Sequence, residues 1–198
     1  MNKTALKKHG SVFIALGMCP QVLSLTEKEI RIEVFPSIEG VLAPLGKEPV
    51  LFAGKVQALV FPDATMPGEV KVSASIDANH LLVIYPNLTD DERARLLKQM
   101  RERVLKTQAF SNIEFNSTEI TTELENGQLC LVGNLEICGV TKTISILFHL
   151  TEDNRLEGET TLKQSDFAII PLTAFGGTLR AKDKVKIRVV ITAQDFLK

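Results

Sequence analysis

The segment LEICGVTKTISILFHL, residues 135–150, decides the fold class. Its apolar side chains recur at every second position on both sides of residues 139–142, which is the period of a β-strand. The alternating residues are Leu135, Ile137, Ile144, Ile146, Phe148 and Leu150. This pattern predicts a hairpin with one apolar wall and with a turn or bulged corner at residues 139–142, where Gly139 gives backbone freedom and Lys142 faces water. Glu136 and Cys138 are expected to face away from the wall.

The same alternation extends over most of the chain. It occurs in residues 30–34, 52–60, 70–76, 113–117, 129–137, 156–162 and 185–191. Prolines and a glycine at residues 62–68, and turn-forming residues between the later segments, separate these runs. About eight strands with hairpin spacing predict an all-β, antiparallel fold in one domain. Strands with one apolar face are buried either as two stacked sheets or as one sheet closed into a barrel.

Residues 89–106 break the alternation and predict one amphipathic helix. Thr89 with Glu92 three residues later forms a capping box, and Asp90 and Asp91 place negative charge in the first turn. The narrow apolar stripe consists of Leu97, Met100, Val104 and Leu105. Such a helix packs one edge against a sheet. Its arginine-rich remainder is either a solvated face or a surface that attracts an anionic membrane.

Composition argues against several classes of function. The 198-residue chain carries 23 Lys and Arg against 24 Asp and Glu, a balance that gives no basic surface for nucleic acid. No run reaches the roughly 18 apolar residues that span a bilayer, so no integral membrane span is expected. The three histidines and three cysteines show no metal-ligand spacing, and no phosphate-binding or nucleophile motif occurs. The sequence therefore predicts no enzyme, no metal and no other cofactor.

The cysteines are expected to be free thiols. If Cys130 and Cys138 lie on one extended strand, they are about 27 Å apart, far beyond the reach of a disulfide. We expect them to act as small, partly buried apolar side chains.

Residues 1–25 resemble an export signal in part. Lysines precede an apolar stretch at residues 12–18, but Pro20 interrupts it and no AxA-like cleavage site follows. The segment is interpreted as a signal peptide, a tail or a leading strand, with the folded domain at residues 26–198. A cleaved signal would make the protein periplasmic or secreted, and its absence would make the protein cytoplasmic.

Three segments in the C-terminal two-thirds of the chain carry recognisable motifs. Residues 110–118 (FSNIEFNST) resemble FPxIxFxST, residues 133–142 (GNLEICGVTK) resemble GxLxIxGVTK, and residues 163–169 (KQSDFAI) resemble RSDFGI. Ser111 and Ala168 stand where these motifs have proline and glycine. The order and spacing of the motifs, with a helix ending just before the first, are similar to those of the YceI-like family.

The resemblance implies a lipocalin-like, eight-stranded antiparallel β-barrel around a long apolar tunnel. It also implies binding of polyisoprenoid chains, isoprenoid quinones or fatty amides, in a family whose members are commonly bacterial and periplasmic. The resemblance favours the barrel over the stacked sheets. The strand alternation then indicates which side chains point inward, where they line the tunnel or, on the alternative interpretation, fill a closed core. They are Phe52, Val56, Val72, Ile76, Phe115, Leu135, Ile137, Ile146, Phe148, Phe167, Ile169, Ile187 and Val189.

Asp166 is the one polar residue for which a site role is weighed. It precedes the apolar residues 167–170. An aspartate at a strand entrance usually accepts hydrogen bonds from nearby backbone amides. The functional alternative is that its carboxylate orients a polar ligand head at the barrel mouth.

The leading hypothesis for function is a carrier or buffer for a long apolar lipid. Each buried CH₂ group contributes about 0.8 kcal/mol, so such a lipid needs no polar anchor. The alternative is a structural or interaction module with a filled barrel and no ligand. A lipid-modifying enzyme rests only on analogy between barrels. The sequence leaves open whether a bound lipid is an isoprenoid or a quinone, and whether the chain forms a homodimer.

Overall fold

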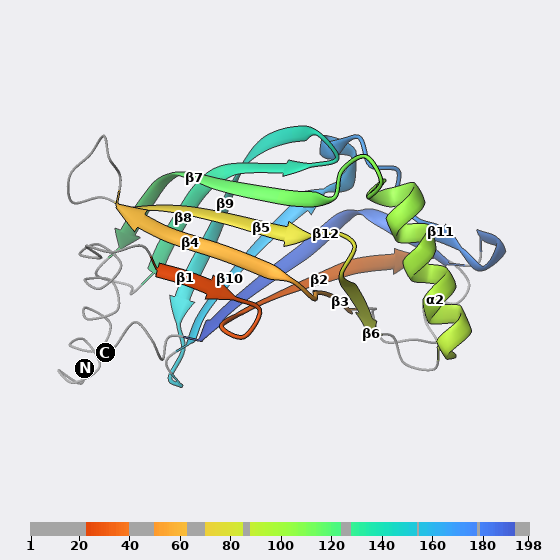
Figure 1. Ribbon diagram of the computed structural model, residues 1–198, viewed down its shortest axis with the longest axis horizontal. Helices are drawn as coiled ribbons and strands as arrows, with labels where there is room; N and C mark the ends of the chain where they lie inside the picture. Colours follow the sequence, from red (N-terminus) through yellow and green to blue (C-terminus); the bar gives the residue numbers. More distant parts are fainter. Residues whose placement is uncertain are drawn as a thin grey trace.

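The chain forms one strongly curved antiparallel sheet with an α-helix across one end (Figure 1). The computed structural model describes residues 23–39, 50–62, 70–84, 88–123, 128–153, 155–177 and 179–192. Most of the segment interpreted as an export signal, residues 1–22, lies outside these described residues, and so does most of the predicted loop at residues 62–68. Leu23 begins the first described strand.

Twelve strands make up the described part of the sheet. They are β1 (Leu23–Thr26), β2 (Ile30–Glu39), β3 (Val50–Ala53), β4 (Val56–Pro62), β5 (Val70–Asp77), β6 (Leu81–Ile84), β7 (Asn112–Glu123), β8 (Gln128–Ile137), β9 (Val140–Leu150), β10 (Arg155–Lys163), β11 (Thr173–Ala174) and β12 (Leu179–Thr192). Their order in the sheet is β1-β4-β5-β7-β8-β9-β10-β12-β2-β3-β6, and β11 pairs with β12. Every pairing is antiparallel, so the prediction of an antiparallel all-β fold is confirmed.

One bent hairpin curves the sheet. One of its arms consists of β3 and β4, and the other consists of β5 and β6. Only Gly54 and Lys55 separate β3 from β4, and only residues 78–80 separate β5 from β6. At the bend the Gly54 N–H donates to the His80 carbonyl at 2.7 Å, and the Asp77 N–H donates to the Lys55 carbonyl at 3.1 Å. A Cβ atom at Gly54 would lie 2.3 Å from the His80 oxygen, which explains the glycine at this position.

The two halves of this hairpin have different neighbours. β3 pairs with β2 and β6, whereas β4 pairs with β1 and β5, and β5 pairs with β7. The bend thus divides the predicted strand at residues 52–60 into β3 and β4. Together with the short strands β1, β6 and β11, this division gives twelve described strands instead of about eight.

The predicted helix is confirmed. Helix α2 spans Asp90–Gln99 and continues into one π-helical turn, η2, at Met100–Val104. The predicted capping box is present, because the Glu92 N–H donates to Thr89 Oγ1 at 3.3 Å and the Thr89 N–H donates to Glu92 Oε2 at 2.9 Å. The two bonds satisfy backbone donors at the N-terminus and fix where the helix begins.

The helix contacts the barrel through a stripe that differs from the predicted one by one residue. Leu96, and not Leu97, faces the barrel interior. The interior-facing side chains are Leu96, Met100, Val104 and Leu105. The guanidinium of Arg93 donates to the Val83 carbonyl of β6 at 2.5 Å. Apolar packing and this hydrogen bond together hold the helix across the end of the sheet.

The turn of the β8–β9 hairpin lies earlier than predicted. It consists of Cys138 and Gly139, which have positive φ angles of 52° and 75°, and Ile137 pairs with Val140 across it. Two central residues with positive φ are typical of a type I′ turn, whose twist matches that of the flanking strands. Residues 140–142 belong to β9, so the predicted turn at residues 139–142 is corrected to residues 138–139.

The side chain of Cys138 also differs from its prediction. Its Sγ donates to the Leu105 carbonyl at 3.3 Å, so it packs against the end of the helix instead of facing away from the wall. Burial raises the pKa of this thiol. Glu136 is exposed, as expected. Cys130 and Cys138 are free thiols, as predicted.

The outward face of β2, β10 and β12 carries a charge network. Arg188 donates to Glu157 in a short ion pair, and its Nη1 lies 3.7 Å from Glu33 Oε2. Glu33 Oε1 also lies 3.0 Å from Arg31 Nε, and Glu157 Oε1 lies 3.8 Å from Arg155 Nη2. Only 7% of Glu33 and 8% of Glu157 are exposed. The hydrogen bond from Arg188 outweighs desolvation and holds the pKa of Glu157 below its ordinary value.

Replacement of Arg188 by glutamine is expected to destabilise the fold by about 2 kcal/mol at pH 7, because Glu157 then stays buried without its main cation. Since the folded pKa of Glu157 is lowered, its stabilising contribution is present above its unfolded pKa of about 4.3 and is lost as the pH falls through the folded pKa. In urea unfolding, wild type and variant should therefore differ most near pH 7 and converge as the pH falls through the lowered folded pKa of Glu157.

A difference that stays constant over this pH range would contradict the role assigned to Glu157. The matched control is Lys186→Gln on the same strand. Lys186 Nζ lies 2.8 Å from Glu159 Oε1, but both side chains are about half exposed. The control should cost less than about 1 kcal/mol.

Candidate functional site

The curved sheet encloses an apolar cavity of about 300 Å³. Inward-facing residues of β2, of β4 to β10 and of β12 form its walls, and α2 with η2 covers one end (Figure 1). Among the described residues that line it, only Thr160, Lys163 and Gln164 are polar. The side-chain amide of Gln164 already donates to the Lys182 carbonyl at 2.8 Å. The cavity therefore offers hydrocarbon surface with few groups that could hydrogen-bond a ligand.

The cavity brings together twelve of the thirteen residues predicted to line a tunnel. They are Val56, Val72, Ile76, Phe115, Leu135, Ile137, Ile146, Phe148, Phe167, Ile169, Ile187 and Val189. Ile144 of the hairpin at residues 135–150 joins them, and Leu150 packs against the adjoining core. Contact of these side chains with a ligand stays a prediction.

The side chain of the thirteenth residue, Phe52, lies outside the described part of the chain. The backbone of Phe52 pairs with Glu33 of β2 and Leu82 of β6. Leu82 is exposed, whereas its neighbours Leu81 and Val83 line the cavity. The position of the Phe52 side chain relative to the cavity therefore stays a prediction.

Two alanines that the sequence did not single out make room in the middle of the cavity. Ala58 of β4 pairs with Ala74 of β5, Ala74 pairs with Phe115 of β7, and Phe115 pairs with Leu135 of β8. Residues directly opposite on antiparallel strands share a face, so the four form one inward row, and all four line the cavity. Both alanines continue the alternation of their strands, and this spacing was the signal that could have found them.

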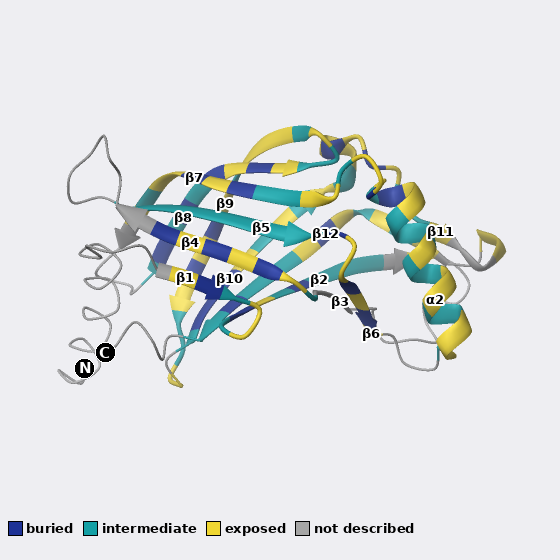
Figure 2. Ribbon diagram, viewed as in Figure 1, coloured by how far each residue is buried: buried dark blue, intermediate teal, exposed yellow. Residues whose placement is uncertain are grey.

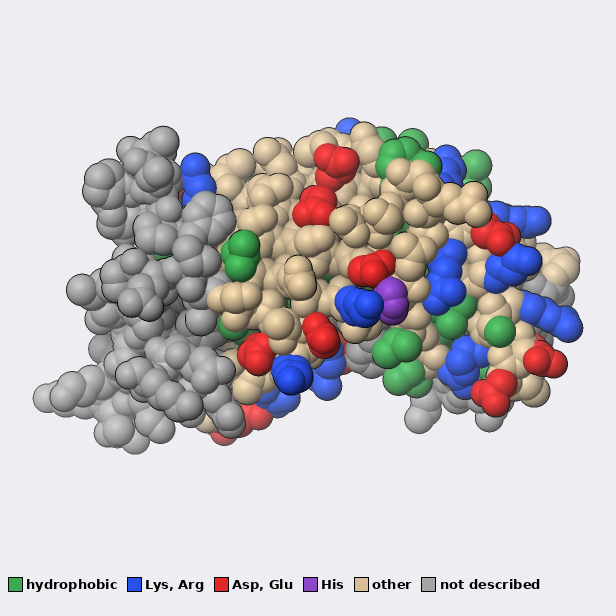
Figure 3. Space-filling view, in the orientation of Figure 1, with side chains coloured by type: hydrophobic (Ala, Val, Ile, Leu, Met, Phe, Trp, Pro, Cys, Tyr) green, Lys and Arg blue, Asp and Glu red, His purple; other side chains and the backbone are tan. Residues whose placement is uncertain are grey.

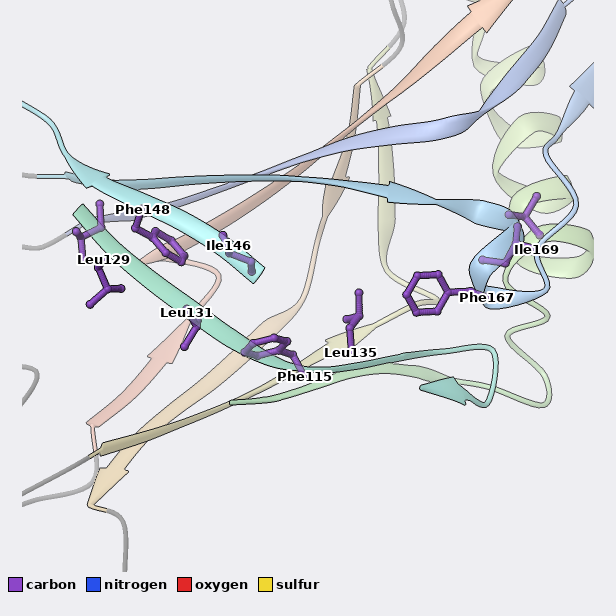
Figure 4. Packing of buried hydrophobic residues seen from close by; sticks show 10 residues of the cluster. Phe115, Leu129, Leu131, Leu135, Ile146, Phe148, Phe167 and Ile169 are labelled. Carbon is purple, nitrogen blue, oxygen red and sulfur yellow. The ribbon is translucent and has the colours of Figure 1, made fainter. Parts of the chain in front are cut away.

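The labelled side chains of the core are arranged along the cavity (Figure 4). Phe148 and Leu129 lie at one end, Phe115 lies between, and Phe167 and Ile169 lie beside the helix. Phe167 is 2% exposed and is among the largest fully buried side chains of the described residues. The cavity thus runs between an end near Phe148 and an end covered by the helix.

The two ends differ in how they are closed. At the first end Leu129 and Leu156 are buried, 6% and 2% exposed, in the same core cluster as Phe148. At the helix end Lys163, the one charged residue in the described lining, is exposed, and it adjoins Gln164. Figure 2 shows exposed and intermediate residues on α2, and buried residues that alternate with exposed ones along β4. The lining is thus exposed and polar at the helix end, and we call the buried end near Phe148 the deep end.

Asp166 lies in a 3₁₀ helix, η3, at Gln164–Phe167, and not at the entrance of a strand. The backbone bonds expected of it are made by Asp183, whose carboxylate accepts from the Ser165 N–H at 2.8 Å and from Ser165 Oγ at 2.7 Å. Both bonds hold the pKa of Asp183 below its ordinary value. Asp166 itself is exposed at the helix end. Ala168 ends η3 with a φ of 53°, a conformation that favours the glycine of the resembling motif.

Polar groups away from the cavity form surface pairs. His80 Nδ1 lies 2.6 Å from Asp77 Oδ2 in the bend between β5 and β6, and His149 is exposed on β9. Figure 3 shows acidic and basic side chains mixed over the visible face, with several Lys and Arg side chains over α2. Within the described ranges, no three His, Cys, Asp or Glu side chains are grouped so that they could hold a metal ion. None of the described helices has the length and apolar character to cross a bilayer.

Known proteins with this architecture were found among solved structures. BcnA from Burkholderia cenocepacia has a TM-score of 0.58 and 15% identity, over 82% of this chain and 94% of its own. A polyisoprenoid binding domain from Saccharophagus degradans, implicated in plant cell wall breakdown, has a TM-score of 0.53 and 9% identity, over 86% of this chain and 97% of its own. At such identities the likeness concerns the fold alone.

No curated protein matches the chain. The model of the YceI-like domain matches residues 50–193, a region that includes β3 to β12 and almost all of the described cavity. The barrel architecture, the three motifs and this match agree, and the chain belongs to the YceI-like family.

Proposed function

We propose that the protein binds a long apolar lipid, such as a polyisoprenoid, an isoprenoid quinone or a fatty amide, inside the barrel as a carrier or buffer. The observation that carries the proposal is the cavity of about 300 Å³, whose lining among the described residues is hydrocarbon except for three residues. The class of lipid is suggested by the Saccharophagus degradans domain, a protein of the same fold that is described as polyisoprenoid binding.

Burial of hydrocarbon can supply the affinity without a polar anchor. Each buried CH₂ group contributes about 0.8 kcal/mol, so about ten methylenes contribute about 8 kcal/mol. This corresponds to a Kd of about 1 μM before the cost of ordering the chain is subtracted. The cavity volume is at the lower end of the range for small-molecule sites, roughly 300 to 1,000 Å³. It therefore suits a short chain or one segment of a longer chain.

Lipid extraction and native mass spectrometry test this function. Purified protein should carry a co-purified lipid, and protein stripped of lipid should take up added prenol or quinone with one lipid per barrel. Repeated absence of lipid from protein made in several hosts, together with no uptake of added prenol or quinone, would overturn the proposal. That outcome would favour the structural or interaction module instead.

A further inference from the structure

Phe148 and Gly158 form an unusually close pair in the wall of the cavity. They lie directly opposite each other on β9 and β10. A Cβ atom built on Gly158 would lie 2.5 Å from Cε1 and 2.6 Å from Cδ1 of the Phe148 ring. Real Cβ atoms essentially never approach other atoms so closely, so the Phe148 ring occupies the space that a side chain at residue 158 would need. The absence of a side chain at residue 158 therefore determines where this ring lies.

The Phe148 ring belongs both to the buried core and to the lining of the cavity. Phe148 is 2% exposed, and on the side away from the cavity it packs among Leu129 and Leu156, which are buried in the same core cluster. On the other side it lines the cavity, as does Val189, the residue opposite Gly158 on β12. Figure 4 shows the ring at the end of the cavity distant from the helix. A group that displaced it from the sheet would push it into the cavity.

An alanine in place of Gly158 would displace the ring without straining the backbone of residue 158. Its φ is outside the positive region, where Gly139, Gly176 and Gly177 lie, so alanine fits its backbone conformation. A substitution at Gly133 would affect the backbone as well as a ring. A Cβ atom there would lie 2.4 Å from the Phe115 ring but also 2.6 Å from the Asn116 carbonyl oxygen, so the backbone would have to move. At Gly158 the three nearest atoms all belong to the Phe148 ring.

We propose that Gly158 and Phe148 together determine the length of the hydrocarbon chain that the cavity accepts. The glycine keeps the ring against the sheet and leaves the deep end open, and the ring forms the floor on which the chain ends. This inference rests on the proposed lipid binding and adds a specificity-determining pair to it.

The test measures binding of saturated 1-alkanols, from about eight to about twenty carbons, to lipid-stripped wild type and to Gly158→Ala. Each methylene that no longer fits costs about fourfold in Kd, so loss of two or three methylenes weakens the longest well-bound alkanol by roughly 15- to 60-fold. Shorter alkanols should bind both proteins equally, so the chain length with the lowest Kd moves down. Phe148→Leu should shift the chain length with the lowest Kd to longer alkanols. The preferred chain length of the double variant should lie between those of the single variants, because leucine at residue 148 is smaller and relieves the contact with the alanine at residue 158.

The control is Thr161→Ala, an exposed residue on the same strand, which should leave the length profile of binding unchanged. If wild type binds no alkanol of any length, the proposed lipid binding itself fails. If wild type binds but neither Gly158→Ala nor Phe148→Leu moves the preferred length, this inference is overturned. Should Gly158→Ala not fold, the upward shift in Phe148→Leu decides alone.

Discussion

Ala74→Phe is expected to abolish lipid uptake while the barrel stays folded. Ala74 lines the cavity between Ala58 and Phe115, the point where the inward row of side chains is smallest. A phenyl ring there occupies the space through which a hydrocarbon chain must pass to reach the deep end. If about four or five methylenes lose their site, the loss is about 3 to 4 kcal/mol, or roughly 200- to 1,000-fold in Kd.

Uptake of prenol by native mass spectrometry, together with circular dichroism of the variant, measures this effect. The control is Leu59→Phe, which adds a ring on the neighbouring strand at a position that is 41% exposed and outside the cavity lining. It should bind lipid as wild type does. A folded Ala74→Phe variant with unchanged uptake would place the lipid outside the cavity and contradict the proposed site.

Phe167→Ala is expected to destabilise the protein by about 3 to 5 kcal/mol, the usual cost of emptying a buried aromatic site. Phe167 is 2% exposed and comes from the short helix η3, which the chain leaves through Ala168 in a left-handed conformation. The loop has little freedom to collapse into the vacated space, because Ser165 in the same short helix is held by two hydrogen bonds to Asp183. The cavity left behind should therefore stay open and its full cost should appear.

The free energy of unfolding in urea measures this loss. Ile170, three residues away and 82% exposed, provides the control, since Ile170→Ala should change stability by no more than about 0.5 kcal/mol. A loss below about 1 kcal/mol in Phe167→Ala would show that the ring does not support the helix end. Added prenol should restore part of the stability if the lipid occupies the same cavity.

The strand periodicity predicted the inward side chains well, because a β-strand presents one face to the cavity for its whole length. Phe115, Leu135 and Phe148 were found in this way, and they line the cavity. The capping box at Thr89 was predicted from a different, local signal, because its hydrogen bonds join residues only three apart. Local interactions and uninterrupted strands are therefore the part of this structure that the sequence determines directly.

The features that the sequence did not reveal depend on contacts between distant residues. The bend at Gly54 is stabilised by a hydrogen bond to the carbonyl of His80, and no local sequence pattern predicts this partner. Cys138 was expected to face away from the apolar wall because it alternates with Ile137, but the positive φ of the turn directs its thiol to the end of the helix. Asp166 was considered for hydrogen bonds to backbone that Asp183 makes instead, because Ser165 and Asp183 are brought together only by the pairing of β10 with β12.

The pairing of β2 with β12 has a consequence for how the protein assembles during synthesis. The hairpins β4–β5, β7–β8, β8–β9 and β9–β10 join strands that follow one another in the sequence, so they can form while the chain is still emerging from the ribosome. β2 must wait, because most of its partners, such as Val189 opposite Ile32, are in the last described strand to be made. A chain truncated before β12 can therefore contain every inward residue of the β8–β9 hairpin and still have no enclosed cavity.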